Sequence, residues 1–170
     1  MIYTVTHAKM REMASHWISK NEDLVIELGC NAGNFATLMH KKGVKYIGVD
    51  IQKDKIDQAR KVLPKMKFKV CDITKDVNLL KKASSFVSFQ CLEHIKEDKK
   101  VLNAITQGTK VIISVPNSKF KGHVRWYEVD GWKERFSTYI DLDKVITIQN
   151  PKKANKRAFL FRGNRNGYKD

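Results

Sequence analysis

The stretch VIELGCNAGNF, residues 25–35, runs from an apolar strand through a glycine turn into the start of a helix. Glycine lets the backbone adopt a positive φ and pass close to a ligand, and the first turn of a helix offers free N–H groups to a carboxylate or phosphate. A dinucleotide-binding GxGxxG pattern counted from Gly29 needs glycine at Asn31 and Asn34, so it fails. A Walker loop fails too, because no GK[ST] follows. The stretch therefore predicts a ligand site without naming the ligand.

Short β-rich runs alternate with longer helical runs around this stretch. The candidate strands are Leu24–Leu28, Tyr46–Val49, Lys67–Val70, Phe86–Gln90, Lys110–Val115, Thr138–Ile148 and Arg157–Arg162. The candidate helices between the first five strands are Asn34–Lys42, Lys53–Leu63, Lys75–Lys82 and Lys96–Ile105. This alternation predicts a parallel sheet with helices on both faces. Continuously apolar runs such as LVIEL and KVIISV are typical of strands buried on both faces.

The pattern changes toward the C-terminus. The last two candidate strands are joined by the short polar segment 150–155, which leaves no room for a crossover helix and so predicts an antiparallel hairpin. We therefore expect an α/β fold, Rossmann-like and doubly wound, with a mostly parallel seven-stranded sheet and a C-terminal antiparallel hairpin. Residues 1–170 form one domain in this interpretation. An N-terminal helix near Ala8–Ser19 lies within residues 1–22, and residues 163–170 form a disordered basic tail.

Composition limits the class of protein. A chain of 170 residues, 42% of them hydrophobic, is long enough for one domain with a core. No apolar run approaches the roughly 18 residues that a membrane span needs, and the start of the chain lacks the apolar core of a signal peptide, so we expect a cytoplasmic protein without a membrane partner. Three cysteines without CxxC spacing argue against a disulfide framework or a zinc site.

A formal net charge of +15 is the most unusual bulk property. A basic surface attracts polyanions, which makes nucleic acid one possible partner. Lysine greatly outnumbers arginine, whereas bidentate recognition of phosphate and guanine favours arginine. Lysine-rich codon usage explains the charge equally well, and both explanations stay open.

An acidic residue closes each of the next two candidate strands. Asp50 ends the run that begins at Tyr46, and Asp72 follows the run that begins at Lys67. A carboxylate beside the glycine turn of a doubly wound sheet can accept both hydroxyls of a ribose, which we expect of Asp50. Asp72 would accept the exocyclic amine of an adenine while Ile73 flanks the ring. The alternative for both acids is a helix N-cap, a position that aspartate favours.

Five motifs in register resemble those of class I S-adenosylmethionine (SAM)-dependent methyltransferases. They are ELGCNAG, YIGVDI, VCDIT, FQCLEHI and VIISVPN, and the resemblance covers residues 23–148. LEHI after the fourth strand, SVPN ending the fifth and a following H-x-R-aromatic segment are most similar to a subgroup that includes ubiquinone-biosynthesis O-methyltransferases. The family implies SAM as cofactor and methyl transfer as activity.

The resemblance also implies which residues hold SAM. Residues of the glycine turn would contact its methionine part: Gly29, Cys30, Asn31 and Gly33. Gln90 would face the same end, and Glu27 would order the loop or accept from an ammonium group. Asp50 would hold the ribose, with Ile51 against the adenine and Asp72 and Ile73 framing it from the other side. The family often has a third glycine where Asn31 stands, a common change that leaves cofactor binding expected.

The segment after the fourth strand carries candidate catalytic residues. Some relatives have E-x-x-E-H here and bind a divalent metal, including small-RNA 2′-O-methyltransferases. In this chain the first of those carboxylates is replaced by Gln90, whose amide is a poorer ligand for a hard cation. We therefore expect no metal and activity without one. Glu93 and His94 are candidate catalytic residues instead, with His94 as general base or substrate-orienting group. The alternative for His94 is a cap of the following helix.

A second candidate group follows the fifth strand. In the family, the H-x-R-aromatic segment lines the substrate side, which makes His123 and Arg125 candidate catalytic residues. Together with His94 they indicate an acidic or hydroxyl-bearing acceptor. A base is required only where the acceptor is protonated near neutral pH, as a hydroxyl is. The alternative for Trp126 and Tyr127 is packing against the next helix.

Three functions follow as hypotheses. The first is methyl transfer to an oxygen or nitrogen atom of a small molecule, supported by the resemblance and by the lack of a target-recognition domain. The second is a nucleic-acid methyltransferase, which draws on the charge and on the lysine-rich loop 117–122. The third is a non-catalytic binding protein with the same fold, against which the retained glycines and acids argue. The sequence determines neither the acceptor nor the oligomeric state.

Overall fold

A computed structural model describes residues 2–151, 153 and 155–167, with side chains from residue 7 on. The helices are α1 (Ile2–Trp17), α2 (Asn34–Lys42), α3 (Lys53–Val62), α4 (Asp98–Ala104) and α5 (Val129–Ser137), with 3₁₀ helices η1 (Val77–Lys82) and η2 (Leu92–His94). The strands are β1 (Val25–Leu28), β2 (Tyr46–Asp50), β3 (Lys67–Val70), β4 (Ser85–Phe89), β5 (Lys110–Pro116), β6 (Ile140–Gln149) and β7 (Arg157–Arg165).

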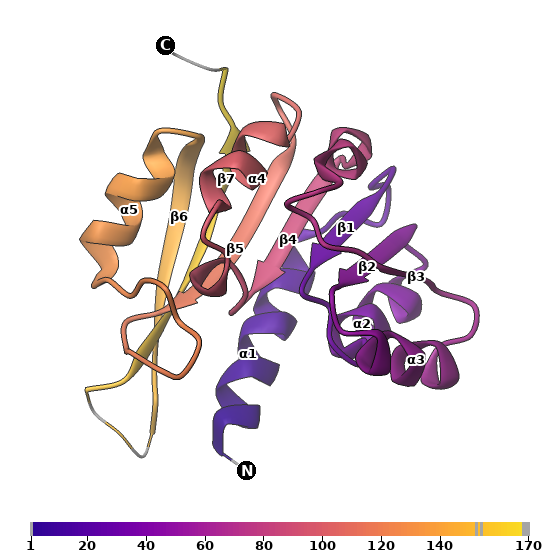
Figure 1. Cartoon of the computed structure of the whole chain (residues 1–170), viewed down its shortest axis with the longest axis horizontal. Helices are drawn as coiled ribbons and strands as arrows, with labels where there is room; N and C mark the ends of the chain where they lie inside the picture. The colour runs from indigo at the N-terminus through magenta and orange to yellow at the C-terminus, as the bar shows by residue number, and fades with distance from the viewer. Residues whose placement is uncertain (1, 152, 154, 168–170) are drawn as a thin grey trace.

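One seven-stranded sheet organises the chain, with strand order β3-β2-β1-β4-β5-β7-β6 (Figure 1). The pairs from β3 through to β5 are parallel, whereas β7 runs antiparallel to both of its neighbours, β5 and β6. The order reverses at β1 and β4, which is where ligands bind in open α/β sheets. The predicted doubly wound sheet with its C-terminal antiparallel hairpin is confirmed.

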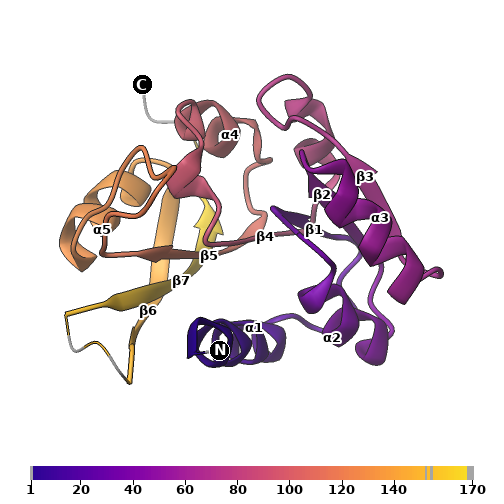
Figure 2. The same cartoon turned by 60° about the horizontal axis from the view of Figure 1, so that its bottom comes forward.

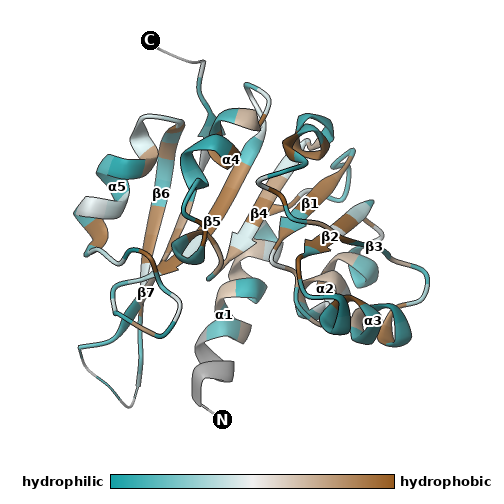
Figure 3. Ribbon diagram, viewed as in Figure 1, coloured by the Kyte–Doolittle hydropathy of each residue, from teal (hydrophilic) through white to brown (hydrophobic). Residues whose placement is uncertain are grey.

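Helices cover both faces of the sheet, as Figure 2 shows. On one face, α1, α2 and α3 contribute Ala14, Phe35 and Ile56 to a core cluster with apolar residues of the strands. On the other face, α4 and α5 contribute Leu102 and Trp132 to a second cluster. The central strands β1, β4 and β5 are mostly hydrophobic (Figure 3), and β1 is buried at every position. Burial on both faces is the reason that VIEL and KVIISV carry no polar alternation.

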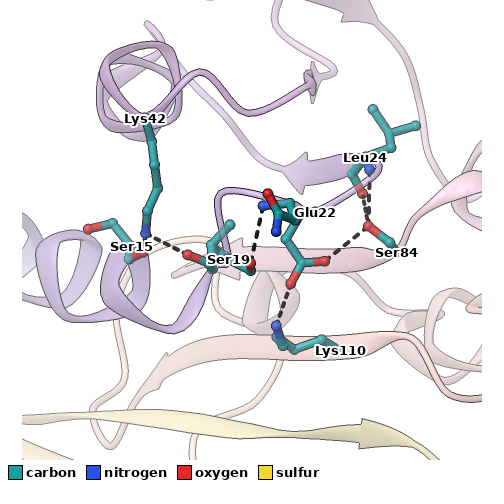
Figure 4. A network of polar contacts seen from close by, with 9 residues as sticks. Ser15, Ser19, Glu22, Leu24, Lys42, Ser84 and Lys110 are labelled. Carbon is teal, nitrogen blue, oxygen red and sulfur yellow. Dashed lines mark hydrogen bonds and ion pairs between the residues drawn. The ribbon is translucent and has the colours of Figure 1, made fainter.

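The segment between α1 and β1 is fixed by a polar network at the amino ends of the strands (Figure 4). Lys42 of α2 donates to the carbonyl of Ser15 at 2.5 Å, which closes the C-terminal turn of α1. Glu22 accepts from Lys110 of β5, and the Leu24 amide donates to Ser84 Oγ at 3.0 Å. The network holds α1 in place relative to the sheet.

Several predicted boundaries were wrong. The predicted tail 163–170 is strand β7 as far as Arg165, because the Arg165 side chain is buried and donates to the carbonyls of Leu102 and Tyr139. Residues 168–170 lie outside the described residues. The predicted strand start Thr138 is wrong, since β6 begins at Ile140.

Three expected helices differ from the structure. The N-terminal helix expected near Ala8–Ser19 begins earlier, as α1 over Ile2–Trp17. The expected helix Lys75–Lys82 is a 3₁₀ helix over Val77–Lys82. The expected helix Lys96–Ile105 begins only at Asp98 and is preceded by η2. No described helix combines the length and the apolar character that crossing a bilayer requires.

Candidate functional site

The glycine turn after β1 has three residues with positive φ. These are Gly29 at 73°, Asn31 at 48° and Gly33 at 82°. Asparagine is among the few residues with a side chain that adopt this conformation readily, and Asn31 Oδ1 accepts from the Ala32 N–H at 2.7 Å. The turn therefore keeps its shape although asparagine stands where relatives often have glycine.

Asp50 fastens the turn to the end of β2. Its carboxylate is 8% exposed and accepts the Asn31 N–H at 2.9 Å and the Gln52 N–H at 2.9 Å. Gln52, rather than Asp50, is the N-cap residue of α3, so the alternative interpretation of Asp50 as a helix cap is wrong. A carboxylate offers about four acceptor sites, so two of them stay available for a ligand.

A cleft of about 860 Å³ opens along the carboxyl ends of the strands. Nine of the ten predicted cofactor residues line it: Glu27, Gly29, Cys30, Asn31, Asp50, Ile51, Asp72, Ile73 and Gln90. The tenth, Gly33, is buried at the N-terminus of α2 and does not line the cleft. The motif residues that the sequence placed in one site are therefore brought together by the fold.

Two isoleucines that line the cleft differ in exposure. Ile51 is 64% exposed although it is apolar, whereas Ile73 is 3% exposed. Asp72 accepts from the Thr74 hydroxyl at 2.7 Å and from its amide at 3.1 Å, and these hydrogen bonds lower the pKa of its carboxyl. Asp72 orders a turn rather than capping a helix, because the residue that precedes η1 is Asp76.

An acidic and a basic side chain, Glu27 and Arg11, line the inner end of the cleft. Glu27 is 3% exposed and accepts a hydrogen bond from the Tyr46 hydroxyl of β2. Burial raises the pKa of Glu27 to about 8, although the Tyr46 hydrogen bond and the charge of Arg11 act in the opposite direction. Arg11 and His7 of α1 line the same end. Neither residue was predicted, because α1 carries no motif and reaches the cleft only through its packing on the sheet.

Gln90 lies where the cleft meets a smaller cavity. Its φ is 50°, and its side-chain amide donates to Ser114 Oγ of β5 at 3.2 Å. The smaller cavity, of about 30 Å³, shares Gln90 and His7 with the cleft and is otherwise lined by the ends of β5, β6 and β7 and by loop residues next to them. Gln90 and His7 therefore border both spaces.

Two predicted catalytic histidines lie side by side. The ring centroids of His94 and His123 are 4.7 Å apart. His94 Nδ1 is 3.0 Å from the Gly122 carbonyl, and His123 Nδ1 is 3.0 Å from the Ser118 carbonyl. Since a carbonyl only accepts, each Nδ1 must carry a proton. His94 lines the cleft, whereas His123 does not.

The loop that carries His123 is fastened to η2. The Val124 N–H donates to the Glu93 carbonyl at 2.9 Å. Arg125 donates to the carbonyl of Leu92 at 3.0 Å and lies 3.1 Å from the carboxylate of Asp98. These contacts occupy the guanidinium, which favours a structural role for Arg125 over the predicted catalytic one.

Glu93 is fully buried beside the histidines. Neither of its carboxylate oxygens makes a hydrogen bond with another described residue. Burial raises the pKa of Glu93 to about 8, although its own backbone N–H and the charge of Arg125 act in the opposite direction. Glu93 does not line the cleft, and one ligand atom each from Glu93, His94 and His123 lie within 4.8 Å of one another.

Comparisons with known proteins agree with this geometry. The methyltransferase domain family matches residues 7–153. The sequence has no significant match among curated proteins.

Solved structures share the fold at low sequence identity. A 1,6-didemethyltoxoflavin-N1-methyltransferase of Burkholderia thailandensis, with its substrate and S-adenosylhomocysteine (SAH) bound, is 14% identical with a TM-score of 0.77, over 98% of this chain and 81% of that one. A magnesium protoporphyrin IX methyltransferase of Synechocystis with bound SAM is 15% identical with a TM-score of 0.73, over 95% and 80%. The PH0226 protein of Pyrococcus horikoshii is 19% identical with a TM-score of 0.73, over 92% and 88%.

Proposed function

The chain belongs to the methyltransferase domain family, and from this premise we propose that it transfers the methyl group of SAM to an oxygen or nitrogen atom of a small molecule. The observation that carries the proposal lies at the end of β2. There Asp50 presents a carboxylate and Ile51 an exposed apolar side chain to one cleft, directly beside the glycine turn. This pair suits a ribose and the adenine attached to it.

The chemistry of the cleft fits the rest of the cofactor. Its volume of about 860 Å³ falls within the roughly 300–1,000 Å³ of ordinary ligand pockets. At the inner end, the Arg11 guanidinium matches the carboxylate of a methionine moiety in charge, and the Glu27 carboxyl offers a hydrogen-bond acceptor to its ammonium group. Asp72 at the outer end uses Oδ1 for its hydrogen bonds with Thr74, while its Oδ2 lies 3.6 Å from the exposed Lys75 ammonium.

For methyl transfer, the main task of the protein is to position the reactants. SAM supplies a methyl group that its sulfonium has already activated. The chain has to align the acceptor with that methyl and exclude water. Gln90 and His7 border both the cleft and the smaller cavity, so we place the meeting point of cofactor and acceptor between them. His94 stands at the rim, with the Nε2 of its neutral form free to act on an acceptor.

The choice of a small-molecule acceptor is supported by two structural neighbours. One is named for magnesium protoporphyrin IX and the other for 1,6-didemethyltoxoflavin. A closer relation to ubiquinone-biosynthesis O-methyltransferases, a single domain over residues 1–170 and a cytoplasmic location stay predictions. The charge of +15 favours a nucleic-acid methyltransferase as the second candidate function.

Calorimetry with SAM and SAH tests the cofactor site. We expect Asp50→Ala to weaken binding by about 2–3 kcal/mol, the scale of hydrogen bonds to a charged group. Asp54→Ala is the matched control, because Asp54 is an exposed acid of α3 four residues away. Equal affinity in the wild type and Asp50→Ala would remove the ribose assignment. A screen of acceptors with labelled SAM then identifies the substrate.

A further inference from the structure

The smaller cavity beside the cleft has a basic wall. Lys156 and Arg157 line it where β7 begins, and none of the described residues around it is acidic. Burial and the charge of Arg11 lower the pKa of His7 to about 4, so His7 is uncharged near neutral pH. The positive charge at the cavity therefore comes from Lys156 and Arg157, and it suits an anionic group.

Arg157 has a buried donor that the protein leaves without a partner. Its Nε is buried and donates to none of the described residues, although 40% of the side chain is exposed. The carboxylate of Glu128 is 3.7 Å from another nitrogen of the guanidinium, and 60% of the Glu128 side chain is exposed. Such an exposed pair contributes little. Buried polar groups normally have a partner, and each exception requires an explanation. An anion in the cavity supplies one.

The backbone holds both cationic residues at the cavity. The Asn150 N–H donates to the Lys156 carbonyl at 2.9 Å, which closes the hairpin between β6 and β7. The Arg157 N–H donates to Asn117 Oδ1 at 2.8 Å, and the Arg157 carbonyl accepts from the Asn117 N–H at 3.1 Å. Because these hydrogen bonds fix the backbone before a ligand binds, less ordering is needed when it does.

The size of the cavity favours a carboxylate among the anionic groups. One water-sized group needs roughly 10–15 Å³, so a cavity of about 30 Å³ has room for two such groups, as many as a carboxylate has oxygens. The guanidinium of arginine presents parallel N–H donors that match a carboxylate. Neighbouring cations also lower the basicity of a carboxylate, and a less basic oxygen is a weaker nucleophile. A carboxylate held here is therefore an anchor and not the atom that receives the methyl group.

We propose that the methyl acceptor carries a carboxylate, which Arg157 and Lys156 bind in the smaller cavity. The proposal rests on the proposed function, because it specifies the acceptor of that methyl transfer. Gln90 and His7 border both the cavity and the cleft, so an acid anchored there presents its remaining part toward the cofactor. The substrate class is that of small carboxylic acids with a hydroxyl or amino group as methyl acceptor.

These residues differ from those that the sequence suggested for the acceptor. Arg125 donates to a backbone carbonyl and lies 3.1 Å from the carboxylate of Asp98, so its guanidinium is already engaged. His123 lines neither the cleft nor the smaller cavity. Arg157 was not predicted, because it reaches the cavity through the pairing of β7 with β5.

Titration with sodium acetate in the absence of SAM tests the carboxylate subsite by itself. NMR follows the Arg157 Nε–H signal and the backbone amide signals of Gln90 and Ala158, against sodium chloride at equal ionic strength. We expect saturable shifts with acetate and at least tenfold weaker binding of acetamide, which has a similar shape without the charge. Arg157→Gln should weaken acetate binding at least tenfold, as read from the two backbone signals. Arg162→Gln is the matched control, because it removes the same charge from β7 at a residue that pairs with Asp143 outside the cavity.

Matched acceptors connect the subsite to methyl transfer. Small hydroxy acids and amino acids are offered with labelled SAM, each beside its amide. An acid that is methylated should react at least tenfold faster than its amide, and Arg157→Gln should raise KM for the acid while the affinity for SAM stays that of the wild type.

The outcomes separate this proposal from the proposed function. The absence of saturable acetate shifts, equal acetate binding in Arg157→Gln, or an amide methylated as fast as its acid would overturn the carboxylate subsite, even where SAM binds. Failure to bind SAM beside intact acetate binding would contradict the proposed function, and with it the role of the bound carboxylate as part of a methyl acceptor.

Discussion

At the scale of single residues, the glycine turn shows why certain positions allow no side chain. Gly29 has a φ of 73°, and a Cβ on it would lie 2.6 Å from Cys91 Sγ. Gly43, at the end of α2, has nearly the same φ of 72°, with nothing within 4 Å of the Cβ position. The two glycines share the backbone strain that a substitution would cause, and only Gly29 adds a steric clash.

This pair yields the first prediction. Gly43→Ala should lower the free energy of unfolding by about 1 kcal/mol, the cost of placing alanine at positive φ. Gly29→Ala should cost clearly more, because Cys91 must also move. Chemical denaturation of both variants and the wild type measures the difference. Equal losses of unfolding free energy in the two variants would mean that the Cys91 side chain moves aside without destabilising the fold.

Glu27 yields a prediction about pH. Its pKa is about 8 in the folded chain, against an ordinary value of 4.5, because burial outweighs the Tyr46 hydrogen bond and the charge of Arg11; the nearby Asp50 raises it further. The unfolded chain releases the proton first, so the free energy of unfolding should fall as the pH rises from about 4.5 to about 8.

Denaturation at pH 5.5 and 8.5 tests this titration. The decrease in stability between the two pH values should be smaller in Glu27→Gln than in the wild type, because glutamine does not ionise. Glu12→Gln, at an exposed position of α1, is the control and should behave as the wild type does. The prediction is refuted by an unchanged pH dependence in Glu27→Gln.

At the scale of elements, one buried acid holds three segments together. Asp98 opens α4 and is 0% exposed. Arg135 of α5 donates to it at 2.8 Å, and Arg125 of the preceding loop lies 3.1 Å away. Removing the acid leaves two largely buried cations without their partner, which is costly.

Asp98→Ala should therefore lower the free energy of unfolding by about 3 kcal/mol. The matched control is Asp130→Ala, which breaks an exposed pair with Lys133 on the same helix as Arg135 and should cost less than about 1 kcal/mol. Urea denaturation measures both. A loss below 1 kcal/mol in Asp98→Ala would mean that water solvates the two arginines after the acid is removed.

The elements differ in how far the sequence predicts them. β1 and β5 were predictable because burial on both faces makes them continuously apolar. Helix α5 was not predicted, because Trp132 and Phe136 are its only buried residues and, apart from Val129, the others are charged or small. In the sequence, the end of β7 looks like a basic tail. The carbonyls of Leu102 and Tyr139 that bind Arg165 come close to it only in the folded chain.

At the scale of the whole molecule, the candidate site too was predictable where it depends on local motifs and not where it depends on packing. The parts built by local motifs, such as the turn around Gly29 and the acid Asp50, were predicted with their positions. The parts built by packing distant segments were not: Arg11 reaches the cleft through α1, and the orientation of His94 depends on a loop 28 residues away. Periodicity and motif spacing contain no information on such contacts.

The fold also bears on the origin of the charge. Arg125, Arg135 and Arg165 are engaged in contacts within the chain, mostly with backbone carbonyls and Asp98. They are therefore not free to form bidentate contacts with phosphate or guanine, which favour arginine. The positive charge left on the surface comes mainly from lysine. Its compact ammonium group attracts polyanions without distinguishing their sequence.

We accordingly predict that the chain binds RNA weakly and without sequence preference. With a net charge of +15, fluorescence anisotropy at low salt should detect binding to a short single-stranded RNA. The logarithm of the affinity should fall linearly with that of the salt concentration, by about 0.7 for each phosphate neutralised. Two RNAs of unrelated sequence should give the same curve, because counterion release does not depend on sequence, and neither should accept label from SAM. Saturable methyl incorporation into one of the two RNAs would contradict the small-molecule proposal and make nucleic-acid methylation the better account of the charge.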